Sequence, residues 1–171
     1  MRKGFLGALV VWALVASSLA QNNRSGVGTW KMDASQSDFG SDPAPKSVTI
    51  TVLKDTPEML SWRVHLIDDK GKAIFYSWSG PEDGSMHSVM QMAKEIGKQS
   101  AKKEDDGSLL RHGEDPDGSS FDARSKISDD GNTMTEETTE KSKDGKETKQ
   151  KGVYRRASTR KKASEKKSGA E

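Results

Sequence analysis

The sequence predicts an all-β domain: an antiparallel up-and-down meander of about eight to ten strands that closes into a barrel. Two observations predict this fold. Turn-forming Asp-Gly pairs recur through the second half of the chain, and the segments between them alternate apolar and polar residues. After an apolar N-terminal stretch, no long segment keeps a helical period. Because closure removes exposed edge strands, we expect a barrel rather than an open sheet.

The first twenty residues are typical of a secretory signal peptide. Two basic residues precede an apolar stretch over residues 5–15, and Ser18 and Ala20 have the spacing of a signal peptidase site. The apolar stretch is shorter than the roughly 20 residues that a membrane-spanning helix needs. We therefore expect a signal-peptide helix that is cleaved after about Ala20, and a domain located in the periplasm or outside the cell.

The sequence divides into four parts: a signal peptide (1–20), a flexible leader (21–26), a β-barrel domain (27–156) and a disordered basic tail (157–171). The signal carries two of the 28 basic residues and none of the 26 acidic ones, so the processed chain has 26 of each. This balance gives no support to nucleic-acid binding. The chain has no cysteine, so an exported domain would have no disulfide to stabilise it.

Six Asp-Gly-like clusters predict the turns of successive hairpins. Gly adopts a positive φ freely and Asp tolerates it, and a type I′ turn needs a positive φ at both central residues. The Gly-to-Gly spacings are 13, 23, 11, 13 and 14 residues. Each spacing suits one strand and a turn, except the longest, which has room for two strands. The glycines are Gly71, Gly84, Gly107, Gly118, Gly131 and Gly145.

Alternation of apolar and polar residues predicts the individual strands. Val48, Ile50 and Val52 share one face of the first clear strand. Near Met86 the apolar spacing fits a short helix or a strand followed by a loop, and we favour the strand. The other expected strands cover residues 60–67, 73–78, 121–127, 133–139 and 151–156.

The two ends of the predicted barrel resemble the first and last strands of the lipocalin and fatty-acid-binding group. Residues 28–31 read Gly-Thr-Trp-Lys, and residues 153–156 read Val-Tyr-Arg-Arg. The first of these segments and the residues after it are similar to small lipocalin-like domains of secreted bacterial proteins. The resemblance implies that Trp30 plugs the closed end of the barrel. It also implies that a basic residue of the last strand, Arg155 or Arg156, packs across that ring.

Three aromatic side chains are the candidate ligand contacts. The resemblance implies a small hydrophobic or amphipathic ligand inside the barrel, and Trp62, Tyr76 and Trp78 would contact it if they point inward. The alternative is that the tryptophans form the core. Each large aromatic buries about 150–250 Å², and the processed chain has few other large apolar residues.

The sequence does not support catalysis or metal binding. It has no cysteine nucleophile and no Gly-x-Ser-x-Gly, phosphate-loop or His-Glu-x-x-His motif. His65, His87 and His112 are widely separated, so we interpret them as strand residues rather than metal ligands. The Asp-Gly clusters lack the ligand spacing of a calcium loop. We therefore expect a non-enzymatic monomer that needs no cofactor or metal.

The C-terminal tail is strongly basic. Seven basic and two acidic residues lie between Arg155 and Glu171, and no apolar face is present, so we expect disorder. Such a tail suits contact with an anionic envelope surface. Two functions follow: an exported lipocalin-like domain that binds a small ligand, or a structural or interaction protein of the cell envelope. In the second, the barrel is filled and acts through its surface and its tail.

Overall fold

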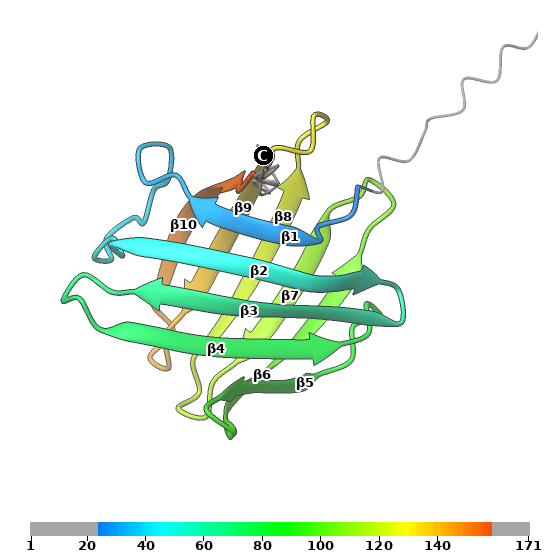
Figure 1. Ribbon diagram of the computed structural model, residues 1–171. Helices are drawn as coiled ribbons and strands as arrows, with labels where there is room; N and C mark the ends of the chain where they lie inside the picture. The colour runs from blue at the N-terminus through cyan, green and yellow to red at the C-terminus, as the bar shows by residue number, and fades with distance from the viewer. Residues whose placement is uncertain (1–23, 159–171) are drawn as a thin grey trace, which may run out of the picture.

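The computed structural model describes residues 24–158, which form a closed barrel of ten antiparallel strands (Figure 1). Consecutive strands are neighbours throughout, and the first strand closes the barrel against the last. The predicted all-β meander that closes into a barrel is confirmed. The predicted signal peptide and residues 159–171 lie outside the described part of the chain. The strands are β1 (Gly28–Met32), β2 (Ser47–Thr56), β3 (Met59–Ile67), β4 (Ala73–Gly80), β5 (His87–Gln91), β6 (Lys94–Lys103), β7 (Leu109–Glu114), β8 (Ser120–Ile127), β9 (Thr133–Lys141) and β10 (Glu147–Arg156).

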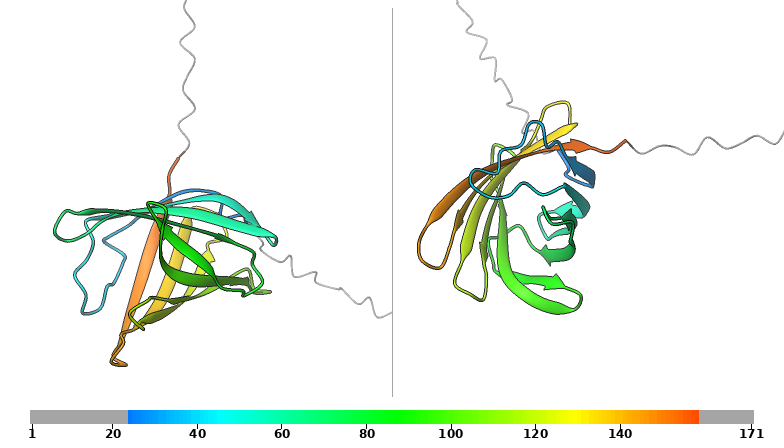
Figure 2. Two further views of the ribbon diagram at one scale, coloured as in Figure 1. Left: turned by 90° about the horizontal axis from the view of Figure 1, so that it is seen from below. Right: turned by 90° about the vertical axis from the view of Figure 1, so that its left-hand side faces the viewer.

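The barrel has two unlike walls. Figures 1 and 2 show β1–β4 forming one wall, which crosses over the strands β7–β10 of the other. The wall of β1–β4 supplies most of the large buried apolar side chains, and the inner face of β7–β9 also carries Arg111, Ser125 and Glu136. Charged and polar side chains therefore reach the interior from β7–β9, and Asp55 of β2 adds a carboxylate from the other wall. The core residues are Trp30, Val48, Val52, Leu60, Trp62, Val64, Trp78, Ala101, Met134 and Tyr154.

Five of the six Asp-Gly-like clusters form hairpin turns, but the predicted type I′ geometry is wrong for them. The cluster around Gly84 instead bridges to β6, where the Gly84 N–H donates to the carbonyl of Ala101. In the β6–β7 turn, Gly107 has a φ of 79°, while Met92 and Ala93 are the only non-glycine residues with positive φ in the described part. The Gly107 N–H donates to the carbonyl of Glu104 at 2.9 Å, and the Glu104 N–H donates to the carbonyl of Ser108 at 2.8 Å. This pattern is a type I turn followed by a left-handed glycine.

The β5–β6 hairpin has the two-residue turn that the Asp-Gly clusters lack. Met92 and Ala93 have φ values of 47° and 65°, and Gln91 pairs with Lys94 on either side of them. In this left-handed conformation Cβ crowds the carbonyl oxygen, which costs about 1–2 kcal/mol per residue. The segment after Met86 is therefore a strand followed by a strained turn, and the favoured strand is confirmed.

We expect Met92→Asn combined with Ala93→Gly to raise the free energy of unfolding by about 1–2 kcal/mol, because Asn-Gly is the preferred type I′ pair. The Met92 side chain is 93 % exposed, so its replacement removes little packing. Urea unfolding followed by tryptophan fluorescence measures the change. Met92→Ala is the matched control and should leave the midpoint nearly unchanged. If the double variant had the same urea midpoint as the unmodified chain, the turn at Met92 and Ala93 would not be strained.

Candidate functional site

Trp30 and Arg156 pack together where β1 pairs with β10. The guanidinium carbon of Arg156 lies 4.1 Å from the centroid of the Trp30 ring, within the range of a cation–π contact. The Trp30 indole N–H donates to the carbonyl of Gly26 at 2.8 Å. Arg155 points elsewhere, with its Nε 3.2 Å from a carboxylate oxygen of Asp33. The resemblance implied that Arg155 or Arg156 packs across the Trp30 ring, and the structure places Arg156 there.

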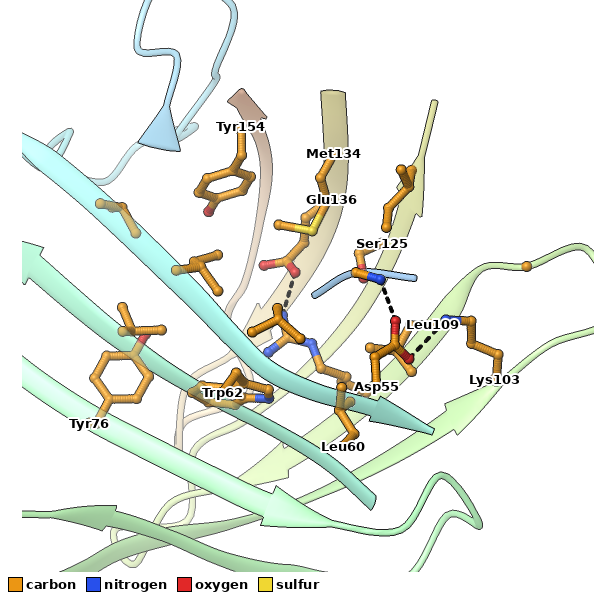
Figure 3. A pocket seen from close by; sticks show the side chains of 18 residues that line it. Asp55, Leu60, Trp62, Tyr76, Lys103, Leu109, Ser125, Met134, Glu136 and Tyr154 are labelled. Atoms are coloured by element: carbon orange, nitrogen blue, oxygen red, sulfur yellow. Dashed lines mark hydrogen bonds and ion pairs between the residues drawn. The ribbon is translucent and has the colours of Figure 1, made fainter. Parts of the chain in front are cut away.

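Residues 24–27 form an N-terminal strap that contacts both Trp30 and Arg156. Arg156 donates to the carbonyls of Val27 and Ser25, the latter at 3.1 Å, and the carboxylate of Asp55 accepts the N–H of Gly26. Figure 3 shows the Asp55 carboxylate bonded both to this strap and to Lys103. Gly26 and Asp55 also line the interior cavity, so the strap forms part of the cavity wall.

A cavity of about 120 Å³ lies inside the barrel. Trp62 and Tyr76, two of the three predicted ligand contacts, line it, and their rings meet edge to face at 5.8 Å. Trp78 is not among the lining residues: its ring stacks on Trp62, and its N–H donates to the carbonyl of Gln99 at 2.9 Å. The structure therefore brings Trp62 and Tyr76 together and places Trp78 in the core.

An ion pair in the cavity wall was not predicted from the sequence. The Arg111 Nη2 lies 2.5 Å from Oε2 of Glu136, and each side chain is 15 % exposed. These residues lie on β7 and β9, and β8 presents the small Ala123 opposite Arg111 and the small Ser125 opposite Glu136. Small residues between them leave room for the two long side chains to meet. No sequence signal identifies this pair, because a charge in an alternating strand normally indicates the solvent face.

The guanidinium of Arg111 is held on several sides. It lies 5.8 Å from the ring centroids of both Trp62 and Phe121, and its Nη1 donates to Oε1 of Gln99 at 3.5 Å. With the carboxylate of Glu136, these contacts fix the position of the charge. Arg111 is therefore a preorganised polar group in a mostly apolar interior.

Two tyrosines, the half-buried Tyr76 and the buried Tyr154, line the same cavity. Burial raises the pKa of Tyr76 to about 12, and burial also raises the pKa of Tyr154. Figure 3 shows their rings pointing toward one another across the cavity. Both hydroxyls are therefore neutral at physiological pH, and each can donate or accept a hydrogen bond. Tyr154 also lines the cavity. Its place in the last strand was predicted from the sequence, but this role was not.

Two buried donors beside Arg111 have no hydrogen-bond partner within the described residues. They are the indole N–H of Trp62 and the side-chain amide nitrogen of Gln99, whose residues are 6 % and 2 % exposed. A buried donor without a partner costs about 1–3 kcal/mol. An acceptor brought into this part of the barrel would therefore be stabilised.

A second cluster of charges lies at the strap end of the cavity. The Lys103 Nζ is 3.5 Å from a carboxylate oxygen of Asp55. Burial and a hydrogen bond with Asp55 raise the pKa of Glu82 from 4.5 to about 7, and the positive charge of Lys103 opposes this shift. Glu82 therefore holds a proton below neutral pH. This cluster carries the carboxylate that holds Gly26 of the strap.

Glu82 should make the protein less stable as pH rises. Its folded pKa is raised, so the folded state binds more protons than the unfolded state between about pH 4.5 and pH 7, and stability falls through that interval. After a discount for solvent screening, we expect a loss of about 1 kcal/mol between pH 5 and pH 8 that Glu82→Gln removes. Urea unfolding of both proteins at the two pH values measures it. Glu147→Gln, at an exposed position of β10 that does not contribute to the Glu82 shift, is the control. Equal pH dependence of Glu82→Gln and the unmodified chain would contradict the assignment.

The three histidines lie in separate environments. His65 stacks on Phe75 with ring centroids 4.2 Å apart, and His112 hydrogen-bonds to Asp122 at 2.8 Å. His87 packs edge to face against the ring of Trp78. Within residues 24–158, no group of three or more His, Cys, Asp or Glu side chains is arranged to hold a metal ion. In the same part of the chain, no helix has the length and apolar character needed to cross a membrane.

The chain is a ten-stranded antiparallel β-barrel, and this architecture is consistent with a lipocalin-like barrel. Comparison with models of known protein families gave no match, and a search of curated proteins found no match either. The function is therefore inferred from the geometry of the barrel interior.

Proposed function

We propose that this protein is an exported lipocalin-like domain that binds a small amphipathic molecule inside its barrel. The observation that carries the proposal is a cavity in which apolar side chains of β2 and β3 face the Arg111–Glu136 pair and two tyrosines. Ligand sites typically combine a mostly apolar lining with a few fixed polar groups. Export rests on the signal-peptide pattern of residues 1–20.

The volume of the cavity limits the size of the ligand. At about 120 Å³ it is smaller than the roughly 300–1,000 Å³ of typical ligand pockets. It is close to the roughly 150 Å³ of an apolar cavity that accepts benzene in another protein. We therefore propose a molecule of about one ring or a short chain, rather than a long fatty acid.

The small volume also supports a second candidate function. A barrel filled by its own side chains would act through its outer surface and its basic tail, as a structural or interaction protein of the cell envelope. The anionic surface of the envelope would then be the partner. Ligand titration separates the two functions, because only the first requires the cavity.

The proposal predicts that single-ring compounds bind and stabilise the chain lacking residues 1–20. At a ligand concentration of 100 Kd, the stabilisation would be about 2.7 kcal/mol. Thermal unfolding and quenching of tryptophan fluorescence measure binding. Leu109→Phe, which fills the cavity from one lining position, is the matched variant and should abolish both signals. If no compound raises the thermal unfolding midpoint of the unmodified chain, the ligand-binding function is wrong and the second candidate, a filled barrel that acts through its surface, takes its place.

A further inference from the structure

We infer that the interior site selects an uncharged ligand that carries a hydrogen-bond acceptor, such as a carbonyl group on a single ring. This inference rests on the proposed function and names the chemical class of its ligand. It follows from the charge balance of the lining and from the indole N–H of Trp62, which has no hydrogen-bond partner within the described residues.

The charges that line the cavity are balanced in pairs. Arg111 is paired with Glu136 at 2.5 Å, and Lys103 is paired with Asp55 at 3.5 Å. The lining tyrosines are neutral at physiological pH because burial raises their pKa values. The lining therefore has one positive and one negative charge in each pair and a net charge of zero.

A charged ligand has no free counterion in this site. A carboxylate approaching Arg111 would also face the carboxylate of Glu136, and an ammonium group approaching Glu136 would face the guanidinium. Moving an uncompensated charge out of water into a largely apolar cavity is strongly unfavourable. Both signs of charge are therefore disfavoured, and a neutral ligand avoids this cost.

An unpaired donor of the lining determines which neutral group binds. The indole N–H of Trp62, which lines the cavity, can only donate. The amide nitrogen of Gln99 also donates, but Gln99 is not among the lining residues. Both residues contact Arg111, Trp62 through its ring and Gln99 through its side-chain oxygen. An acceptor placed beside the guanidinium can satisfy the Trp62 donor, which a hydrocarbon leaves unpaired. A neutral ligand with an acceptor is therefore favoured over a purely apolar one.

Four compounds of nearly equal size test the inference: benzamide (neutral acceptor), benzoate (anion), benzylammonium (cation) and toluene (apolar). Isothermal titration calorimetry at pH 7 measures each dissociation constant on the chain lacking residues 1–20. We expect benzamide to bind at least about tenfold more tightly than the other three, a difference of about 1.4 kcal/mol. This ranking needs no variant, so it tests the inference on the unmodified protein.

A substitution that releases the charge of Arg111 should change the selectivity. Glu136→Gln keeps the shape of the side chain and removes the negative charge, so we expect benzoate affinity to rise about tenfold or more while benzamide changes little. Glu137→Gln, at the adjacent exposed position of β9, is the matched control and should leave all four constants unchanged.

The outcomes separate this inference from the proposed function. If benzoate, benzylammonium or toluene binds the unmodified chain as tightly as benzamide, the cavity binds ligands but the selectivity is wrong. The selectivity is also wrong if Glu136→Gln folds and its ranking is the same as that of the unmodified chain. If none of the four compounds binds, the proposed function itself fails.

Discussion

Trp30→Ala is expected to lower the free energy of unfolding by about 3–5 kcal/mol. The Trp30 ring is fully buried at the strap end of the barrel, and Arg156 packs across it. Its indole N–H also holds Gly26 of the strap at 2.8 Å. The substitution therefore creates a cavity, removes a cation–π contact and frees a buried carbonyl.

Urea unfolding followed by far-ultraviolet circular dichroism measures this loss without relying on the removed fluorophore. Trp30→Phe is the matched variant: it keeps an aromatic ring but removes the hydrogen bond to Gly26, and it should lose less than half as much. A loss below about 1 kcal/mol for Trp30→Ala would show that Trp30 does not close the barrel.

Arg111→Met is expected to lower the free energy of unfolding by an amount on the order of 3 kcal/mol. The substitution keeps most of the side-chain volume but leaves the carboxylate of Glu136 largely buried and without its 2.5 Å partner. The penalty comes from the unpaired charge and not from the lost attraction. Replacing both charges removes that penalty, so Arg111→Met with Glu136→Leu should recover most of the stability.

A double-mutant cycle measured by urea unfolding checks this expectation. It compares the unmodified chain, the two single variants and the double variant at pH 7. A coupling energy near zero, or a double variant as unstable as Arg111→Met, would contradict a paired interior charge. The same proteins report on the site, because the double variant should also lose affinity for benzamide.

The positions of most strands could be predicted from local sequence. No range was predicted for β6 or β7, because neither alternates apolar and polar residues regularly. Turn glycines and two-residue alternation depend on neighbouring residues only, so the hairpins appear where the sequence places them. The type of each turn was harder to predict from the sequence, because it depends on how the flanking strands pair. Gly107 therefore closes a type I turn followed by a left-handed glycine. The type I′ turn lies at Met92 and Ala93, where no glycine indicates it.

The aromatic half of the site could also be predicted, but the ionic half could not. Alternation places Trp62 and Tyr76 on inner faces of their strands, where an apolar residue is expected. Arg111 and Glu136 are charged residues on alternating strands, and a charge in such a pattern normally indicates the solvent face. Their inward direction depends on the registers of β7, β8 and β9, which bring together residues 25 positions apart.

The pairing of β1 with β10 brings the two ends of the folded chain together. The N–H of Ala157 donates to the carbonyl of Thr29 at 2.7 Å, so the start of the first strand and the end of the last emerge side by side. A short linker joining them, with new termini opened in the exposed turn around Gly145, would give a circular permutant that retains the pairing of all ten strands.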